Sequence, residues 1–132
     1  MNFPTDDMAL THILVVSDLQ RSKTFYSQVL GADVHREYGG TSVVLSLLSS
    51  WILLVTGGPP TVDKPDVTFA VPVNPRKVSH AFTIRVPDCN KAYKTLKSRG
   101  AEFLTPPKDW GNEIRCFLKD PDGHLLEISE TT

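Results

Sequence analysis

The chain of 132 residues has only two cysteines and no long uninterrupted apolar run. The longest apolar stretch, from Val43 to Val55, is broken by serines and is shorter than the roughly 20 residues that a membrane-spanning helix needs. Cys89 and Cys116 form no metal or disulfide motif, which favours free thiols in a reducing compartment. Residues 1–10 carry an acidic pair where a signal peptide would carry positive charge. We therefore expect a cytoplasmic protein with no membrane partner.

Strong charge of either sign is also missing. Fourteen basic residues against fifteen acidic ones give a net charge of -1, and no basic run stands out. A nucleic-acid partner is not expected, because such proteins need a basic patch to neutralise phosphates. The sequence contains no GxSxG, P-loop, GxGxxG or HExxH pattern, so acyl-serine hydrolysis, nucleotide binding by those motifs and zincin chemistry have no support.

What the chain does contain is an internal repeat. ILVVSDLQRSKTFYSQVLGADV begins at Ile13, and FTIRVPDCNKAYKTLKSRGAEF begins at Phe82. Each copy is a short apolar run, then Asp18 or Asp88, then a segment of helical period stopped by a glycine, then a new extended run. A unit repeated at this length predicts two similar halves that are too small to be stable alone.

Each half reads as strand, helix, strand, strand, strand, which is an α+β arrangement with a mostly antiparallel sheet and the helices on its outer face. The expected strands and strand-like runs are 11–16, 32–38, 42–48, 50–56, 80–86, 101–105, 114–120 and 124–130, with 106–112 as a turn. We expect one domain over 1–132, with module one at about 10–57, a proline-rich linker at about 58–78 and module two at about 79–130. An edge strand at 67–71 is expected inside the linker.

Three segments together resemble a known family. DLQRSKTFYSQVLGA, SRGAEFLTPP and DPDGHLLEI are similar to segments of the vicinal oxygen chelate superfamily, which includes glyoxalase I, bleomycin-resistance and fosfomycin-resistance proteins and extradiol dioxygenases. The resemblance implies two βαβββ modules whose curved mixed sheets enclose a cavity for a small molecule, with helices outside and a homodimer as the usual assembly. It also implies a divalent metal such as Fe, Mn, Ni or Zn in many members, and none in the bleomycin-resistance proteins.

The implied metal ligands are His12, His80 and Glu127, a two-histidine, one-carboxylate set. Relatives that bind metal place a ligand seven residues before the aspartate that opens each helix, and those positions here are Thr11 and Ala81. Because side chains alternate across a strand, a one-residue offset turns each histidine to the opposite face unless a bulge intervenes. The spacing therefore predicts a degenerate metal site.

Further side chains are expected to contact a ligand in the cavity. Arg85 and Arg115 could each pair with Glu127 or hold an anionic substrate. Thr83 shares the cavity-facing parity of Arg85, and Trp110 could form an aromatic wall at the cavity mouth. We thus expect Arg85, Arg115, Thr83 and Trp110 among the ligand-binding residues.

A fourth family ligand would come from the run that includes Leu53 and Leu54, where no acid is present, and Trp51 in the same run is expected in the core.

Two hypotheses about the function remain open. The first is a protein that binds a small molecule in the inter-module cavity with a degenerate metal site. The alternative is a divalent-metal-dependent lyase, isomerase, transferase or dioxygenase that uses the two histidines and the acid named above. A metal-free enzyme with Glu127 as catalytic general base is a narrower third option.

Overall fold

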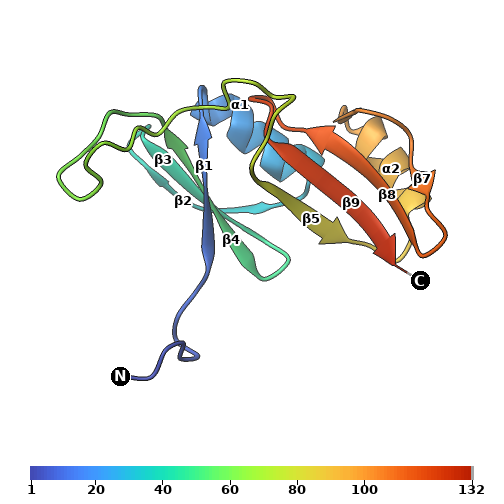
Figure 1. Ribbon diagram of the computed structural model, residues 1–132, viewed down its shortest axis with the longest axis horizontal. Helices are drawn as coiled ribbons and strands as arrows, with labels where there is room; N and C mark the ends of the chain where they lie inside the picture. The colour runs from blue at the N-terminus through green and yellow to red at the C-terminus, as the bar shows by residue number, and fades with distance from the viewer. Residues whose placement is uncertain (132) are drawn as a thin grey trace. The chain divides into compact units, whose positions relative to one another are not determined.

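A computed structural model describes residues 1–131 (Figure 1). The chain divides into two compact units, unit 1 from Met1 to Ala70 and unit 2 from Val71 onward. Each unit contains one helical segment and one mixed sheet, so the α+β fold class is confirmed. Among the described residues, no helix has the length and apolar character to cross a bilayer.

Unit 1 follows the order expected from the first copy of the repeat. Its four strands form a sheet in the order β1-β4-β3-β2, with β1 parallel to β4 and the other neighbours antiparallel. The elements are β1 (Thr11–Val16), α1 (Leu19–Thr24), η1 (Phe25–Val29), β2 (Asp33–Tyr38), β3 (Ser42–Leu47) and β4 (Ser50–Thr56).

The helical segment of unit 1 starts where the sequence indicates. The Asp18 carboxylate accepts a hydrogen bond from the Arg21 amide at 3.0 Å, which satisfies one of the free N–H groups at the helix start. Tyr26 is fully buried, so the helix packs one face on the sheet. The second half of the segment widens into a π-helical turn, which the apolar period does not predict. Gly31, with φ of 79°, then ends the segment.

Unit 2 repeats this topology with two differences from expectation. Its sheet has the order β5-β9-β8-β6, with β7 added beside β8. The elements are β5 (Ala81–Arg85), α2 (Cys89–Ser98), β6 (Glu102–Phe103), β7 (Lys108–Asp109), β8 (Glu113–Lys119) and β9 (Leu125–Thr131). The strand expected at 101–105 thus shortens to two residues, and the segment expected as a turn at 106–112 supplies β7.

The edge strand expected at 67–71 was a wrong prediction. Gly58 and Phe69 exchange two backbone hydrogen bonds at 2.9 Å, but this is an isolated bridge and no strand continues from it. Three prolines within 59–65 lack the N–H that a longer ladder would require, which explains why the pairing stops.

Each sheet buries one face and leaves the other open. In unit 1, α1 packs on β3 and β4, and alternate residues of the strands are buried on that side: Leu14, Val16, Val43, Leu45, Ile52 and Leu54. In unit 2, α2 packs on β8 and β9 in the same way, over Cys116, Leu118, Leu126 and Ile128. The residues between these positions lie on the opposite, open faces, and the site candidates are found there.

Candidate functional site

The open face of the unit 1 sheet carries an apolar pocket. Strand register places Thr11 beside Trp51 and Ile13 beside Leu53, so β1 and β4 present matching side chains to the same side. The pocket has a volume of about 480 Å³ and is lined by Ala9, Thr11, Ile13, His35, Val44, Trp51 and Leu53. Its wall is therefore mostly aliphatic and aromatic, with a hydroxyl and an imidazole as its polar groups.

Two residues of this pocket were not predicted correctly from the sequence. Trp51 was expected in the core but is only half-buried and lies on the open face. His35 is not among the residues expected to contact a ligand, yet its ring meets that of Trp51 edge-on, with centroids 5.0 Å apart and planes at 72°. The register of β2 shifts between Val34 and Arg36, and this irregularity breaks the alternation from which the orientation of His35 could have been read.

The family's metal-ligand positions in unit 1 hold residues that are not metal ligands. His12 pairs in register with the buried Ile52 and shares the parity of Leu14, so it lies toward the covered face. Thr11 faces the pocket in its place. Leu53 lies beside the third residue of β1, and Glu127 lies beside the third residue of β5. Leu53 is therefore the counterpart of Glu127 in unit 1.

In unit 2 the open face is polar. Glu127 is half-buried between its neighbours in register, Thr83 on β5 and Phe117 on β8. The exposure of β5 alternates as predicted, with Ala81, Thr83 and Arg85 exposed and the residues between them partly covered. His80 precedes β5 and is exposed. Within residues 1–131 no three His, Cys, Asp or Glu side chains gather as a metal ion would require.

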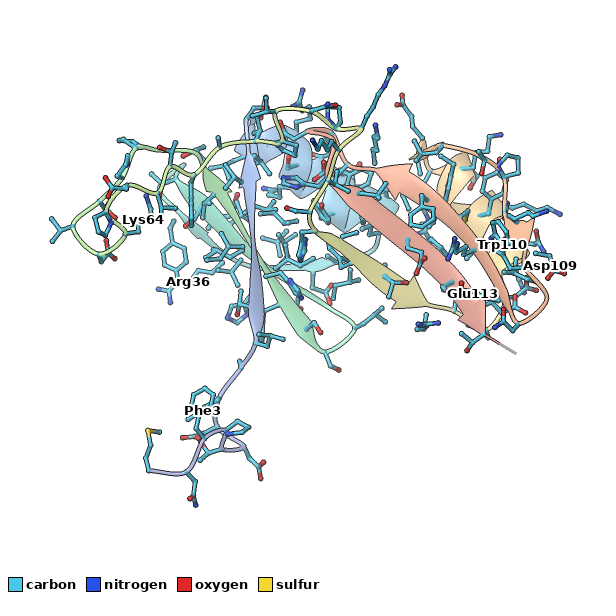
Figure 2. All side chains as sticks on the ribbon, in the orientation of Figure 1. Phe3, Arg36, Lys64, Asp109, Trp110 and Glu113 are labelled. Carbon is cyan, nitrogen blue, oxygen red and sulfur yellow. The ribbon has the colours of Figure 1, made fainter. Side chains whose placement is uncertain are left out.

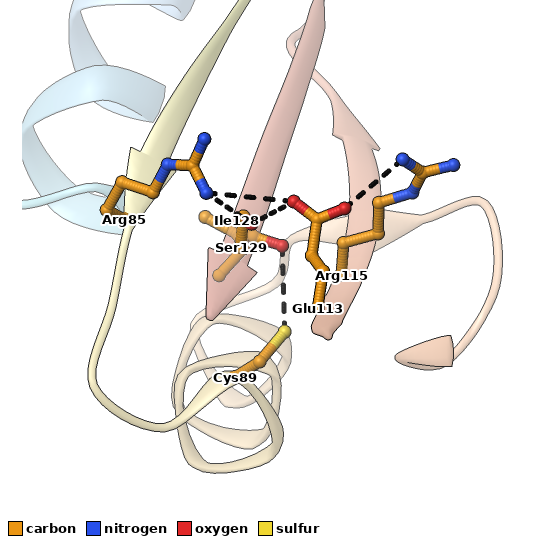
Figure 3. Close-up of polar contacts among 6 residues, drawn as sticks. All are labelled: Arg85, Cys89, Glu113, Arg115, Ile128 and Ser129. Carbon is orange, nitrogen blue, oxygen red and sulfur yellow. Dashed lines mark hydrogen bonds and ion pairs between the residues drawn. The ribbon is translucent and has the colours of Figure 1, made fainter. Parts of the chain in front are cut away.

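Glu113, at the start of β8, is the centre of a charged cluster on this face (Figure 3). Its Oε2 accepts a hydrogen bond of 2.6 Å from the Ser129 hydroxyl, and its Oε1 lies 3.3 Å from Nη1 of Arg115. Arg85 donates from Nη1 to the Ser129 hydroxyl at 3.2 Å and lies 3.7 Å from Oε2 of Glu113. Both arginines thus pair with Glu113, where the sequence had offered Glu127 as their partner.

The cluster shapes the ionisation of its acid. The hydrogen bond from Ser129 and, to a smaller extent, the charges of Arg115 and Arg85 lower the pKa of Glu113, although its partial burial opposes them. The carboxylate is therefore ionised throughout the neutral range. No sequence signal marks Glu113, because its partners come from three strands whose register is not legible in the sequence.

Trp110 lies beside this cluster, on the turn after β7 (Figure 2). The guanidinium of Arg115 lies 5.4 Å from the Trp110 ring centroid and 5.6 Å from that of Phe117, and Lys108 approaches the same indole at 5.4 Å. Trp110 itself is 59% exposed. Thr83 and Trp110 therefore lie on or beside the same open face as the two arginines.

Comparison with known proteins gives the same family as the motifs. A sequence model of the Glyoxalase/Bleomycin resistance protein/Dioxygenase superfamily matches residues 9–128. Glutathione transferase FosA of Serratia marcescens is 30% identical over 122 residues, which cover 91% of this chain and 79% of the relative. Lactoylglutathione lyase of Salmonella typhimurium is 28% identical over 130 residues and 93% of both chains.

Solved structures show the same fold at lower identity. Lactoylglutathione lyase from Agrobacterium tumefaciens superposes with a TM-score of 0.71 at 17% identity, covering 96% of this chain and 95% of the other. TnmS3, an antibiotic binding protein from Streptomyces sp. CB03234, superposes with a TM-score of 0.70 at 19% identity, covering 96% and 97%.

Proposed function

The chain belongs to the Glyoxalase/Bleomycin resistance protein/Dioxygenase superfamily, and on that premise we propose that it binds an apolar, ring-containing small molecule without a metal. The single observation that carries this proposal is the pocket of about 480 Å³ on the open face of unit 1. Ligand pockets in proteins typically have volumes of roughly 300–1,000 Å³ and combine apolar walls with a few polar groups. The aromatic ring of Trp51 offers a stacking surface, and Thr11 and His35 offer hydrogen bonds.

The chemistry of the lining favours binding over catalysis by a metal. Divalent ions of the kind used in this family need imidazole or carboxylate ligands. In unit 1 the counterpart positions hold Thr11 and Leu53, and the nearby His12 has the parity of the covered face. His35 alone would supply an imidazole to the pocket. These residues do not fit a divalent ion, so we derive no chemistry through one.

The alternative, a metal-dependent lyase, isomerase, transferase or dioxygenase with His12, His80 and Glu127, draws its support from the relatives, whose names are those of a transferase and a lyase. It is tested by offering Fe(II), Mn(II), Ni(II) and Zn(II) to dialysed protein and measuring the bound metal. One tightly held equivalent that is lost in His80→Ala would favour this alternative and overturn the metal-free proposal. A Glu127→Gln variant that turns over a candidate substrate as fast as the wild type would count against the general-base option, because an amide cannot accept the proton.

A homodimer and a cytoplasmic location complete the proposal. Strand β1 is an edge of its sheet, and Leu10 just before it is 79% exposed, which supports a partner along this edge. The unpaired thiols of Cys89 and Cys116 suit a reducing compartment. Sedimentation at micromolar concentration tests the assembly, and a monomeric mass would contradict it.

Ligand binding itself is tested with an uncharged probe. N-phenyl-1-naphthylamine, a neutral fluorescent amine, should bind saturably to the wild-type protein with one site per chain. Leu53→Glu places a charge inside the pocket and should weaken binding at least about tenfold, because an ionised group there must be desolvated by the probe. Val62→Glu makes the same change at a fully exposed loop position of unit 1 and should leave binding unchanged. Equal affinities for the two variants would refute the pocket as the site.

A further inference from the structure

We propose that the open face of unit 2 carries a separate site for a small carboxylate, in which the side chain of Glu113 occupies the place of the ligand. The proposal rests on the cluster formed by Arg85, Arg115 and Ser129 around that carboxylate (Figure 3). It does not depend on the apolar pocket of unit 1, so either proposal can fail without the other.

The cluster has the composition of a carboxylate clamp. Two guanidinium groups approach one carboxylate from opposite sides, one to each oxygen, at 3.3 Å for Arg115 and 3.7 Å for Arg85. The Ser129 hydroxyl donates to the same group at 2.6 Å. Guanidinium and hydroxyl donors arranged in this way match the two oxygens of a planar carboxylate. The site therefore already shows which chemical group it accepts.

The positive charge of the cluster exceeds what its acid can neutralise. Glu113 is a single carboxylate between two arginines, and Lys108 is the cross-strand neighbour of Arg115 on β7. Two further acids lie on this open face but apart from the two arginines in register: Glu127 lies between Thr83 and Phe117, and Glu102 is opposite Lys119. The arginine side chains remain open to solvent, 59% for Arg85 and 39% for Arg115. An anion from solution can therefore reach both guanidinium groups.

The donors are held in place by contacts other than those to Glu113. Ser129 is fully buried on β9 and receives the hydrogen bond from Arg85. The guanidinium of Arg115 lies against the rings of Trp110 and Phe117. If the Glu113 carboxylate is removed or displaced, these other contacts of the three donors remain. The clamp is thus preorganised, and Glu113 acts as an internal competitor that sets how tightly an external carboxylate binds.

The test is a titration with acetate and, as its uncharged analogue, acetamide. Acetate has too little apolar surface to bind in the unit 1 pocket. In the wild-type protein, acetate at neutral pH should shift the Nε–Hε NMR signals of Arg85 and Arg115, and acetamide should not. Glu113→Gln keeps the size of the side chain and removes the competing charge, so it should tighten acetate binding about tenfold. Adding Arg85→Ala to this variant should abolish the gain.

The matched control is Glu102→Gln, which removes one negative charge at an exposed position of β6 in the same unit. It should change acetate affinity by less than about twofold, since exposed charges at a distance are screened. Equal affinities for the Glu113 and Glu102 variants would overturn the proposal, because Glu113 would then be a structural partner of the arginines only. Arginine signals that stay unchanged at saturating acetate in the wild-type protein would overturn it as well, even if no variant folds.

Discussion

Raising the pH should destabilise the folded chain through two buried thiols, Cys89 at the start of α2 and Cys116 in the middle of β8. Both side chains are buried, and their sulfur atoms lie 3.8 Å apart. The Cys89 thiol also donates to the carbonyl of Ile128 at 3.6 Å (Figure 3). The Cys89 amide donates to a carboxylate oxygen of Glu130 at 2.8 Å. This pair marks the contact between α2 and the sheet of unit 2.

The magnitude follows from the pKa of the inner thiol. Burial, and then the neighbouring sulfur of Cys89, raise the pKa of Cys116 from 9.0 to about 12. Burial raises the pKa of Cys89 as well. At a pH one unit above 9.0 the unfolded Cys116 thiol is ionised and the folded one is not, so the unfolded state gains about 1.4 kcal/mol from this group. The stability is thus fully present below the unfolded pKa and is lost as the pH rises from about 9 toward about 12.

The assay compares the reduced wild-type protein with the double variant Cys89→Ala/Cys116→Ala in urea. The double variant leaves a small cavity, and the stability that this cavity costs does not depend on pH. The informative quantity is therefore how the difference in the free energy of unfolding between the two proteins changes with pH. Between pH 8 and pH 10 the free energy of unfolding of the wild type should fall by at least about 1.4 kcal/mol relative to the variant. A difference that stays constant with pH would refute the buried packing of these thiols, since it would mean that they ionise equally in both states.

Three further substitutions should change the stability of unit 2. Asp88→Ala removes the acceptor for the Lys91 amide at the start of α2 and should cost about 1 kcal/mol of stability in urea unfolding. Gly123→Ala should cost more than about 1 kcal/mol in the same assay, because the residue has φ of 93° and an added Cβ would lie 2.9 Å from Cβ of Pro75. The pKa of Glu113 is lowered from 4.5 in the folded state, so its ionised carboxylate stabilises the fold above pH 4.5 and this stabilisation is lost as the pH falls below that value. A Glu113→Gln variant should therefore lose less stability than the wild type on acidification, which circular dichroism would measure.

Much of the fold could be predicted because its signals are local. The aspartate caps, the glycine stops and the alternation of β1 and β5 are each written in a few consecutive residues. Asp18 and Asp88 cap the two helical segments as expected. The resemblance of the motifs to the superfamily is confirmed by the match over residues 9–128.

The site could be predicted only in part, because its contacts depend on strand register. Arg85 and Arg115 were identified as candidates, but their partner Glu113 was missed, since it lies just before the segment read as a strand. The position of His35 depends on an irregularity in β2 that no residue type announces. Trp51 was expected in the core, whereas its pairing with Thr11 places it on the open face. Side-chain pairing across strands is the information that the sequence alone does not contain.

The most direct test of the proposed function is a methyl and indole NMR titration with N-phenyl-1-naphthylamine. We predict that the indole signal of Trp51 and the methyl signals of Ile13, Val44 and Leu53 shift together with one dissociation constant, because these groups line the same pocket. The methyl groups of Leu54, on the covered face of the same sheet, should shift much less. Shifts centred elsewhere in the chain, or none at saturating probe, would contradict the pocket of unit 1 as the binding site.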